Sequence, residues 1–256
     1  PIVDNDMRIV GIETLDHMFN FKRFENPVVL MAGGYGKRLG GLTKDIPKSL
    51  IRVGEKPILE IILNQFIDHG FYNFHISTHY LSESIKKFFG DGEKWGVSIT
   101  YIHEDEPLGT AGVLSHLPRN FSELPMILMN GDLLTKINFE DLLVFHNSHA
   151  GDATMCVREH DIKVPYGVVN SKENELLSIV EKPTHKFFVN AGVYVLNSSI
   201  FNSIKSKQYI DMPTLLEDKI KNGMKVKTLP LHEYWLDIGQ IEHLDQAQKD
   251  FQDFFI

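Results

Sequence analysis

Short apolar runs alternate with segments of helical period from Pro27 onward. Residues 28–32 (VVLMA) are continuously apolar and predict a buried strand, whereas residues 57–69 (PILEIILNQFIDH) repeat apolar side chains at helical spacing. Parallel strands need long, usually helical crossover connections, so this alternation predicts a largely parallel sheet. The other elements expected in this half are strands at 74–78, 98–102 and 126–129 and helices at 81–89 and 111–117.

The second half of the chain has a different pattern. Few helices separate its strand-like segments, which lie at 153–157, 167–169, 177–180 and 189–196. Helical period returns at 213–221 and 242–251. We therefore expect an α/β fold, a Rossmann-like and mostly parallel sheet flanked by helices, with a mixed β extension that folds over the first sheet.

The composition excludes several classes of protein. The chain has 256 residues, 43% of them hydrophobic, which is enough to bury a substantial core without disulfides. Its net charge of −8 argues against general electrostatic binding to nucleic acid or to a membrane surface, and no apolar run approaches the ~18 residues of a membrane span. The single cysteine, Cys156, lies in an apolar run, which fits a buried thiol in a reducing cytoplasm.

A glycine-rich, basic segment directly follows the first expected strand. Residues 30–50 (LMAGGYGKRLGGLTKDIPKSL) include five glycines, which let backbone N–H groups approach phosphate oxygens. Within residues 33–56, six lysines and arginines face two acidic residues, a local charge of +4 in a chain of −8. This contrast predicts an anion site, and a flexible surface turn with solvated lysines is the alternative.

Two common glycine-rich motifs do not fit this segment. A P-loop requires G-x-x-x-x-G-K-[ST], but Gly36 and Lys37 are followed by Arg38. The dinucleotide fingerprint G-x-G-x-x-G fails at Leu39. An ordinary P-loop protein and an oxidoreductase on a dinucleotide-binding fold are therefore disfavoured.

The string GGYGKRL, followed by PKSL, resembles the signature of sugar-1-phosphate nucleotidylyltransferases, usually written GGxGxRL and then PK. Further strings follow in the order of that family: LGTAG (108–112), NGD (130–132), EKP (181–183), NAGVY (190–194) and WLDIG (235–239). The resemblance covers about residues 27–248. Each string alone is weak evidence, but six in order are specific, and they imply a glycosyltransferase-A-like nucleotidyltransferase domain.

The resemblance implies a reaction and its catalytic residues. A sugar 1-phosphate attacks the α-phosphorus of a nucleoside triphosphate, and pyrophosphate leaves. Arg38 is then expected to hold the pyrophosphate and Lys48 to meet the charge on the α-phosphate, while Asp132 and Asp237 share one Mg²⁺. Surface cations remain the alternative for Arg38 and Lys48, and turn and helix-cap roles remain the alternative for the two aspartates.

The same resemblance implies substrate contacts in both halves. The expected nucleotide-binding residues are Ala32, Gly33, Gly34, Gly36, Lys37, Tyr80, Leu108, Gly109, Thr110 and Gly131. The expected sugar-phosphate-binding residues are Gly167, Glu181, Lys182, Asn190 and Ala191. Glu181 would accept hydrogen bonds from sugar hydroxyls and Lys182 would pair with the phosphate. A solvated charge pair before a turn at Pro183 is the alternative for Glu181 and Lys182.

The two ends of the chain add expectations about domains. Residues 1–26 do not follow the alternating pattern. PIVDNDMRIVGIETLDHMF has a strand, turn, strand and helix pattern of its own, with the turn at Asp4-Asn5-Asp6, and it resembles the closing segment of a CBS module. We expect a CBS-like remnant or linker at 1–26 and the nucleotidyltransferase domain at 27–256, with an ordinary N-terminal hairpin as the alternative. The chain ends soon after the helix that follows Gln240, so we expect a short form without an acyltransferase-type extension.

These features predict a Mg²⁺-dependent enzyme that joins a nucleoside monophosphate from a triphosphate to a sugar 1-phosphate and releases pyrophosphate. The form LGTAG is more similar to guanylyl- than to thymidylyltransferases, so GTP with a hexosamine or heptose 1-phosphate, in surface-polysaccharide synthesis, is the first expectation. A homo-oligomer is compatible with an enzyme of this kind. A nucleotide-sensing regulatory protein that uses the same pocket without turnover is the alternative from another class.

Overall fold

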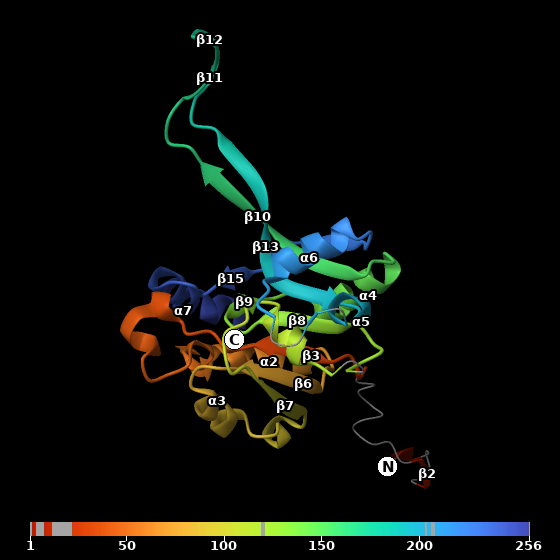
Figure 1. Ribbon diagram of the computed structural model, residues 1–256. Coiled ribbons are helices and arrows are strands. Elements are labelled where there is room, and N and C mark those ends of the chain that lie inside the picture. Colours follow the sequence, from red (N-terminus) through yellow and green to blue (C-terminus); the bar gives the residue numbers. More distant parts are fainter. Residues whose placement is uncertain are drawn as a thin grey trace.

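The computed structural model describes residues 2–3, 8–11, 22–118, 121–202, 204–205 and 208–255. A seven-stranded sheet runs through the body of the molecule (Figure 1). Its strands, in spatial order, are β14 (Val226–Leu231), β10 (Ala153–Lys163), β13 (Thr184–Leu196), β8 (Met126–Asn130), β3 (Val28–Met31), β6 (Asn73–Thr78) and β7 (Ser98–His103). The expected α/β class is confirmed.

The half of the sheet formed by β8, β3, β6 and β7 is parallel, as the alternating pattern predicts. Helices cover both of its faces because the strand side chains alternate: Val28 and Leu30 belong to one hydrophobic cluster and Val29 to the other. The first face is covered by α2 (Ile58–Asp68), α3 (Ser82–Phe89), α4 (Phe139–Ser148) and α7 (Ile241–Phe255). The second face is covered by α5 (Ser198–Phe201) and α6 (Met212–Lys221).

The helix expected at 111–117 is instead a short 3₁₀ helix, η4 (Gly112–His116). Its start is held in a loop, since the Ala111 N–H donates to the Ile210 carbonyl. Its end is fixed by the sequence, because Pro118 disfavours a helical Leu117, which is extended. The segment therefore has no room for full α-helical turns.

The expectation that the second half folds over the first sheet is wrong. Strands β13, β10 and β14 extend the same sheet, since β13 pairs antiparallel with β8, β10 antiparallel with β13, and β14 parallel with β10. This pairing satisfies the N–H and C=O groups that β8 would otherwise expose at its edge. The outer parts of β10 and β13 leave the sheet and continue into β11 (Val168–Lys172) and β12 (Glu175–Val180).

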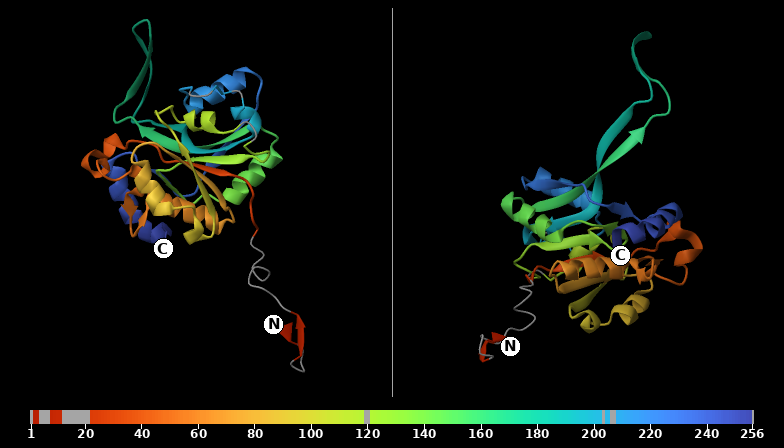
Figure 2. Two further views of the ribbon diagram at one scale, coloured as in Figure 1. Left: turned by 60° about the horizontal axis from the view of Figure 1, so that its bottom comes forward. Right: turned by 180° about the vertical axis from the view of Figure 1, so that it is seen from behind.

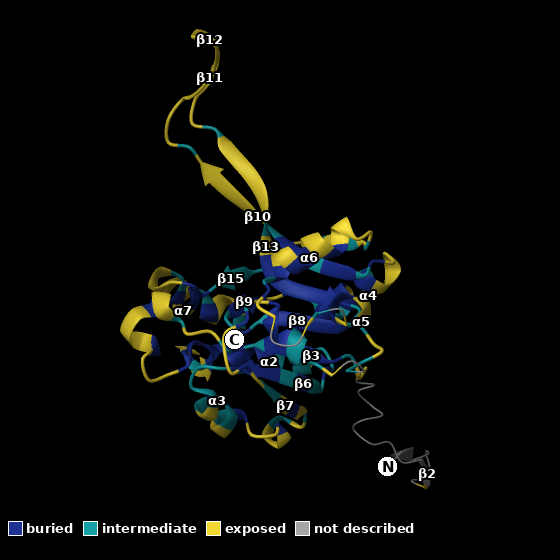
Figure 3. Cartoon of the chain, viewed as in Figure 1, coloured by how far each residue is buried: buried dark blue, intermediate teal, exposed yellow. Residues whose placement is uncertain are grey.

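We call residues 159–188 the arm. It projects from the body into solvent in every view (Figures 1 and 2). Colouring by burial contrasts the exposed arm with the buried centre of the sheet (Figure 3). Cys156 lies just before the arm, inside the body, and burial raises the pKa of its thiol, as expected for an inert cysteine.

Several short elements lie around the sheet. They are η1 (Lys37–Thr43), η2 (Lys48–Leu50), η3 (Glu93–Trp95) and the antiparallel pairs β4 (Arg52–Val53) with β5 (Lys56–Pro57) and β9 (Leu133–Thr135) with β15 (Trp235–Asp237). Among them, η1, η2 and β15 carry Arg38, Lys48 and Asp237. Within the described residues, no helix combines the length and the hydropathy needed to cross a bilayer.

Near the N-terminus, β1 (Ile2–Val3) pairs antiparallel with β2 (Ile9–Gly11). This pairing fits the strand, turn and strand read from the sequence. The turn at 4–7 and the helix expected after the second strand lie outside the described residues. The CBS-like segment and a domain boundary at residues 26 and 27 stay predictions.

Candidate active site

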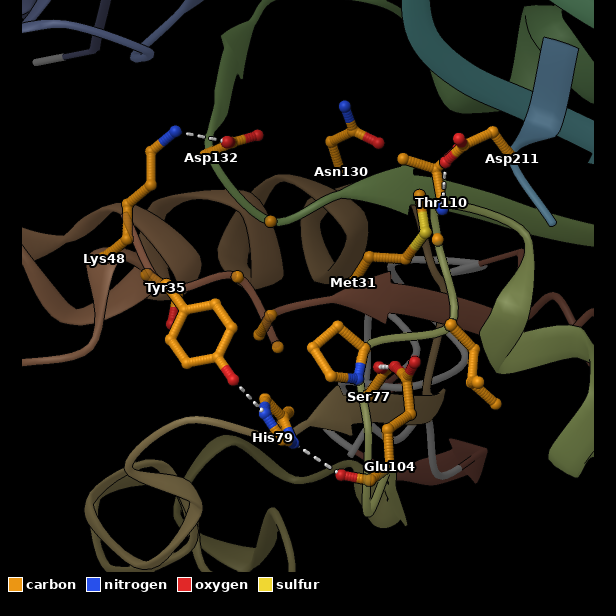
Figure 4. Close-up of a pocket in the computed structure, with 18 residues that line it drawn as sticks. Met31, Tyr35, Lys48, Ser77, His79, Glu104, Thr110, Asn130, Asp132 and Asp211 are labelled. Carbon is orange, nitrogen blue, oxygen red and sulfur yellow. Dashed lines mark hydrogen bonds and ion pairs between the residues drawn. The ribbon is translucent and has the colours of Figure 1, made fainter. Parts of the chain in front are cut away.

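A cavity of about 270 Å³ opens at the carboxyl ends of β3, β6 and β8. The chain runs from β3 outward to β6 and β7 and then returns to β8 on the other side of β3, so β3 and β8 form the switch point at which open α/β sheets bind ligands. The wall of the cavity includes Ala32, Gly33 and Gly34 after β3 and Gly131 and Asp132 after β8 (Figure 4).

Lys48 and Asp132 form an ion pair at one end of this cavity. The Lys48 Nζ donates to Asp132 Oδ2 at 2.5 Å, and the Lys48 residue is only 8% exposed (Figure 4). The other carboxylate oxygen of Asp132, Oδ1, is buried and has no hydrogen-bond partner among the described residues. A buried carboxylate oxygen without a donor is costly, so it marks a place where a ligand or a cation is needed.

Asp237 is brought to Asp132 by backbone pairing. Strand β15 pairs with β9 so that Asp237 lies opposite Leu133, and the Ile238 N–H donates to the Asp132 carbonyl at 3.1 Å. Burial raises the pKa of Asp237, and the negative charge of Asp132 raises it further, while Lys48 partly offsets both effects. Two carboxylates separated widely in the sequence therefore share one site.

Arg38 reaches the same region from η1. A Cβ atom placed on Gly239 would lie 3.5 Å from Asp237 Oδ2 and 3.6 Å from both terminal nitrogens of Arg38. The positive charge of Arg38 also lowers the pKa of Asp237. Arg38, Lys48 and the two aspartates expected from the sequence thus converge, although neither Arg38 nor Asp237 lines the cavity itself.

This donor set fits Mg²⁺. The ion is usually held by one or two carboxylates and completes its shell with water and substrate phosphates. Asp132 and Asp237 supply two hard carboxylate groups, and no described residue gives Asp132 Oδ1 a hydrogen bond. No cluster of three or more His, Cys, Asp and Glu side chains suited to a metal occurs in the described part of the chain, so an all-protein cage is not offered there.

The raised pKa of Asp237 predicts a stability effect. An acid whose folded-state pKa is raised destabilises the fold once pH exceeds its ordinary value of 3.8, because folding then disfavours its ionised form. We expect Asp237→Asn to raise the thermal unfolding temperature at pH 7 in EDTA. The gain should shrink as pH falls towards 3.8, where the wild-type carboxyl is increasingly protonated in both states.

Paired unfolding scans of wild type and variant across this pH range check that expectation. Asp245→Asn, an exposed aspartate on α7, is the control and should change the unfolding temperature little at either end of the range. A lower unfolding temperature for Asp237→Asn at pH 7 would show that the carboxylate is stabilised rather than strained in the apo protein.

The conformation of the glycine-rich loop is fixed by contacts of its own side chains. Gly36 has φ +64°, and a Cβ there would lie 2.7 Å from the Thr43 methyl group, so only glycine fits without strain. The Thr43 hydroxyl donates to the Gly36 carbonyl at 3.0 Å. Tyr35 links the loop to the segment after β6 through a 2.8 Å hydrogen bond with His79 Nε2, and Lys37 lies over the Tyr35 ring.

The opposite wall of the cavity is formed by Leu108, Gly109 and Thr110. The Thr110 N–H donates to Asp211 Oδ1 at 2.9 Å, and the Met212 N–H donates to the Thr110 hydroxyl at 2.8 Å. Asp211 precedes α6 and also lines the cavity (Figure 4). Nothing in the local sequence marks Asp211 as part of a site, because its partner lies 101 residues away.

Glu104 is a second residue that the sequence reasoning missed. It lines the cavity, is 8% exposed, and accepts a hydrogen bond from the Ser77 hydroxyl. Its backbone carbonyl accepts a hydrogen bond from Nδ1 of His79, the ring whose Nε2 bonds with the Tyr35 hydroxyl (Figure 4). The acidic run HEDEP before LGTAG was the available signal, but a run of acids is usually a solvated surface.

The remaining nucleotide-site candidates lie beside the cavity. The Tyr80 hydroxyl donates to the Lys44 carbonyl at 2.7 Å, and its ring packs against Tyr35. Gly36, Lys37 and Tyr80 are absent from the cavity wall. Their contacts with a nucleotide stay predictions.

The expected sugar-site residues are divided between two places. Asn190 and Ala191 lie where β13 joins the body: Asn190 Nδ2 donates to the Tyr194 hydroxyl at 2.5 Å, and the Ala191 carbonyl accepts from Trp235 Nε1 at 2.9 Å. The other three are exposed on the arm: Gly167, Glu181 and Lys182. The structure does not bring these two groups together, and their roles stay predictions.

Comparison with known proteins identifies the family of this chain. The family model described as nucleotidyl transferase matches residues 27–253. A mannose-1-phosphate guanyltransferase of Pichia angusta is 33% identical over 224 residues, covering 83% of this chain and 60% of that protein. The catalytic subunit beta of a Drosophila melanogaster mannose-1-phosphate guanylyltransferase is 33% identical over 223 residues, covering 83% of this chain and 59% of that protein.

Solved structures show the same fold. The crystal structure of HddC from Yersinia pseudotuberculosis complexed with GMP-PN has a TM-score of 0.69 and 25% identity, covering 88% of this chain and 99% of that one. The chain spans about 60% of the length of the curated relatives that it matches. With a family match over nearly all of its length, this chain belongs to the nucleotidyl transferase family.

Proposed function

We propose that this protein transfers the guanylyl group of GTP to a sugar 1-phosphate, giving a GDP-sugar and pyrophosphate. One observation carries the proposal: Lys48, Asp132 and Asp237 converge beside a cavity that the glycine-rich loop borders. Relatives named mannose-1-phosphate guanylyltransferases support the same reaction. They also favour a manno-configured sugar 1-phosphate over the hexosamine and heptose phosphates expected from the sequence alone.

The reaction requires little proton transfer by the protein. The second pKa of a phosphate monoester is about 6, so the sugar phosphate is mostly ionised at neutral pH and needs no strong general base. One of its oxygens forms a bond to the α-phosphorus of GTP, and the bond from that phosphorus to the bridging oxygen of pyrophosphate breaks. The protein must hold two polyanions in line and stabilise charge on both sides of the phosphorus.

Three groups of this chain suit that task. Lys48 is held at the cavity by Asp132, so its ammonium is already oriented before the α-phosphate arrives. Arg38 presents a planar fork of donors near Asp237, which suits the departing pyrophosphate. Asp132 and Asp237 would hold Mg²⁺, which when bound supplies positive charge and a template for the phosphates of both substrates.

Glu104 supports guanine as the base. Guanine presents an N1–H and an exocyclic N2 amino group side by side, and an ionised carboxylate can accept from both. Thymine and uracil present one N–H between two carbonyl oxygens, which a carboxylate repels. Glu104 faces the cavity with Oε1 bound to Ser77, next to the wall of Leu108 and Gly109.

Glu104→Gln is therefore expected to lower kcat/KM for GTP by about 10- to 100-fold, because a neutral amide cannot accept two hydrogen bonds from guanine with the same strength. The ratio of kcat/KM for GTP to kcat/KM for UTP or dTTP should fall, since the charge that repels the carbonyl oxygens of uracil and thymine is gone. Pyrophosphate release with each triphosphate measures both effects. Glu106→Gln, an exposed neighbour in the same acidic run, is the control and should leave both values near wild type.

The proposed function is tested most directly by a substrate matrix. Four nucleoside triphosphates are combined with mannose, glucose, glucosamine and heptose 1-phosphates in Mg²⁺, with pyrophosphate and product mass as readouts. We expect the highest kcat/KM for GTP with mannose 1-phosphate. Turnover with another triphosphate only would overturn the guanylyl assignment, and no pyrophosphate from any pair would overturn the activity.

A further inference from the structure

Among the described residues, none covers the arm. Of residues 159–188, all are exposed except Val164 and Pro183, which are only half-buried (Figure 3). Its side-chain ion pair, Lys186 with Glu159, and its turn hydrogen bond, Val164 N–H to the Pro183 carbonyl, stay within the arm. No arm residue contributes to the cavity of its own body.

Both long edges of the arm are without a strand partner in the part of the chain that the structure describes. Strands β11 and β12 form a two-stranded sheet of their own. In β10, the pairing with β14 ends at Arg158, and in β13 the pairing with β8 begins only at Val193. Isolated two-stranded ribbons are marginal in water, and open edges readily pair with another chain. The ribbon therefore needs a covering surface to be stable.

Both faces of the ribbon carry apolar side chains. Val169 is paired with Ile179 on one face, and Val168 with Val180 on the other. Ten of the nineteen exposed large hydrophobic residues of the described chain lie on the arm. Strands that are apolar on both faces are typical of buried sheets rather than of solvent-exposed hairpins.

The exposed aromatic residues indicate how much area is available. Tyr166, Phe187 and Phe188 are 74%, 51% and 63% exposed. With about 150–250 Å² per aromatic side chain, these three alone expose roughly 300–450 Å². Phe187 and Phe188 are consecutive residues of β13 and lie on opposite faces, so this area is divided between the two faces of the arm. Two such arms provide the apolar centre of a dimer interface of standard size, about 800 Å² per copy.

The arm is also held away from its own cavity by the pairing of its strands. From Val157 opposite Asn190 to Lys163 opposite Thr184, seven consecutive pairs continue straight out of the sheet. At about 3.3 Å per residue this ribbon is roughly 20 Å long. Glu181 and Lys182 lie beyond its end, so the pairing holds them well away from the sheet from which the ribbon starts.

We propose that the arm crosses to a second copy of this chain, and that Glu181 and Lys182 complete the sugar-phosphate site of that copy. This inference rests on the proposed function, because it takes the EKP string as sugar-binding. A two-fold axis would place both arms in equivalent contacts, so that the two sites of a dimer are each built from one body and the other copy's arm. Asn190 and Ala191 of one copy and Gly167, Glu181 and Lys182 of the other would then contribute to the same site.

The test uses two inactive variants with different affinity tags. Lys48→Met disables the body and leaves the arm intact, and the double variant Glu181→Gln/Lys182→Met disables the arm and leaves the body intact. Each alone should release pyrophosphate at least 100-fold more slowly than wild type. Co-expressed heterodimers, purified through both tags, should recover about half of the wild-type turnover per dimer, because one of the two sites then contains only intact parts.

No recovery in the heterodimer would overturn the proposal, since arms acting on their own bodies leave both sites defective. Near-normal activity of the arm double variant alone would also overturn it. Failure of the proposed function looks different, because wild type itself would then release no pyrophosphate, while the mass of the protein in solution would still report whether arms join two copies.

Light scattering across a dilution series provides that second readout. We expect wild type to be a dimer and Val169→Ser/Ile179→Ser to dissociate at a concentration at least tenfold higher. Val144→Ser, a comparably exposed valine on α4, is the matched control and should dissociate as wild type does. A monomeric wild type, or an arm variant that dissociates as wild type does, would overturn the proposal.

Discussion

Asp132→Asn is expected to lower kcat for pyrophosphate release by about 10³-fold or more, which corresponds to about 4 kcal/mol of transition-state stabilisation. The substitution keeps the size of the side chain but removes the charge that pairs with Lys48 and replaces one of the two carboxylate oxygens by an amide nitrogen, which cannot bind a cation. Both the orientation of the lysine and the affinity for Mg²⁺ should fall. Steady-state kinetics over a range of Mg²⁺ concentrations measure the loss.

The loss in Asp132→Asn must be separated from a loss of folding, because the variant leaves a nearly buried lysine without its partner. Asp237→Asn supplies that separation, since it is expected to be at least as stable as wild type in EDTA and yet inactive. Asp245→Asn should retain full activity. Turnover of Asp237→Asn near the wild-type rate would remove the aspartate pair from the mechanism.

Lys48→Met is expected to lower kcat by about 10²- to 10³-fold, with a smaller change in KM, because a preoriented ammonium acts most strongly on charge that develops in the transition state. Methionine retains most of the side-chain length, so the loss reports charge rather than packing. Single-turnover measurements with the preferred triphosphate separate the chemical step from product release.

Two variants control the Lys48 result. Lys44→Met, an exposed lysine of the same loop, should leave kcat near wild type, which excludes a general effect of loop charge. Lys48→Arg should restore only a small part of the activity, because its planar fork cannot take the place of a compact ammonium beside Asp132. A rise in KM alone for Lys48→Met would show that Lys48 binds substrate without acting on the transition state.

Some of the site follows from the sequence because its signals are local. The glycine-rich loop and the cations near it lie within one short stretch, and the strand before it is continuously apolar. Local periodicity also predicts the parallel half of the sheet, since each helix and strand buries a face that its own residues define. The loop residues Gly33 and Gly34 and the strand-end residue Asp132 therefore appear where they are expected, in the cavity wall.

Other parts of the site depend on contacts between distant segments. Asp211 anchors Thr110, and Glu104 is buried against Ser77, but nothing next to them in the sequence distinguishes them from surface acids. Their burial is fixed only once α6 and β6 are packed beside the LGTAG loop. Sequence reasoning assigns the exposed state to such acids because that state is the commoner one.

The sequence by itself determined the alternating α/β layers, the glycine-rich basic loop and the family, because each is encoded in residues that are near one another along the chain. Only the tertiary structure decided that β9 and β15 bring Asp237 to Asp132, and that β10 and β13 continue the sheet and carry the EKP string outward. The physical reason is that strand partners are chosen by hydrogen bonding and burial across the whole fold, and local pattern does not specify which edge a strand will join.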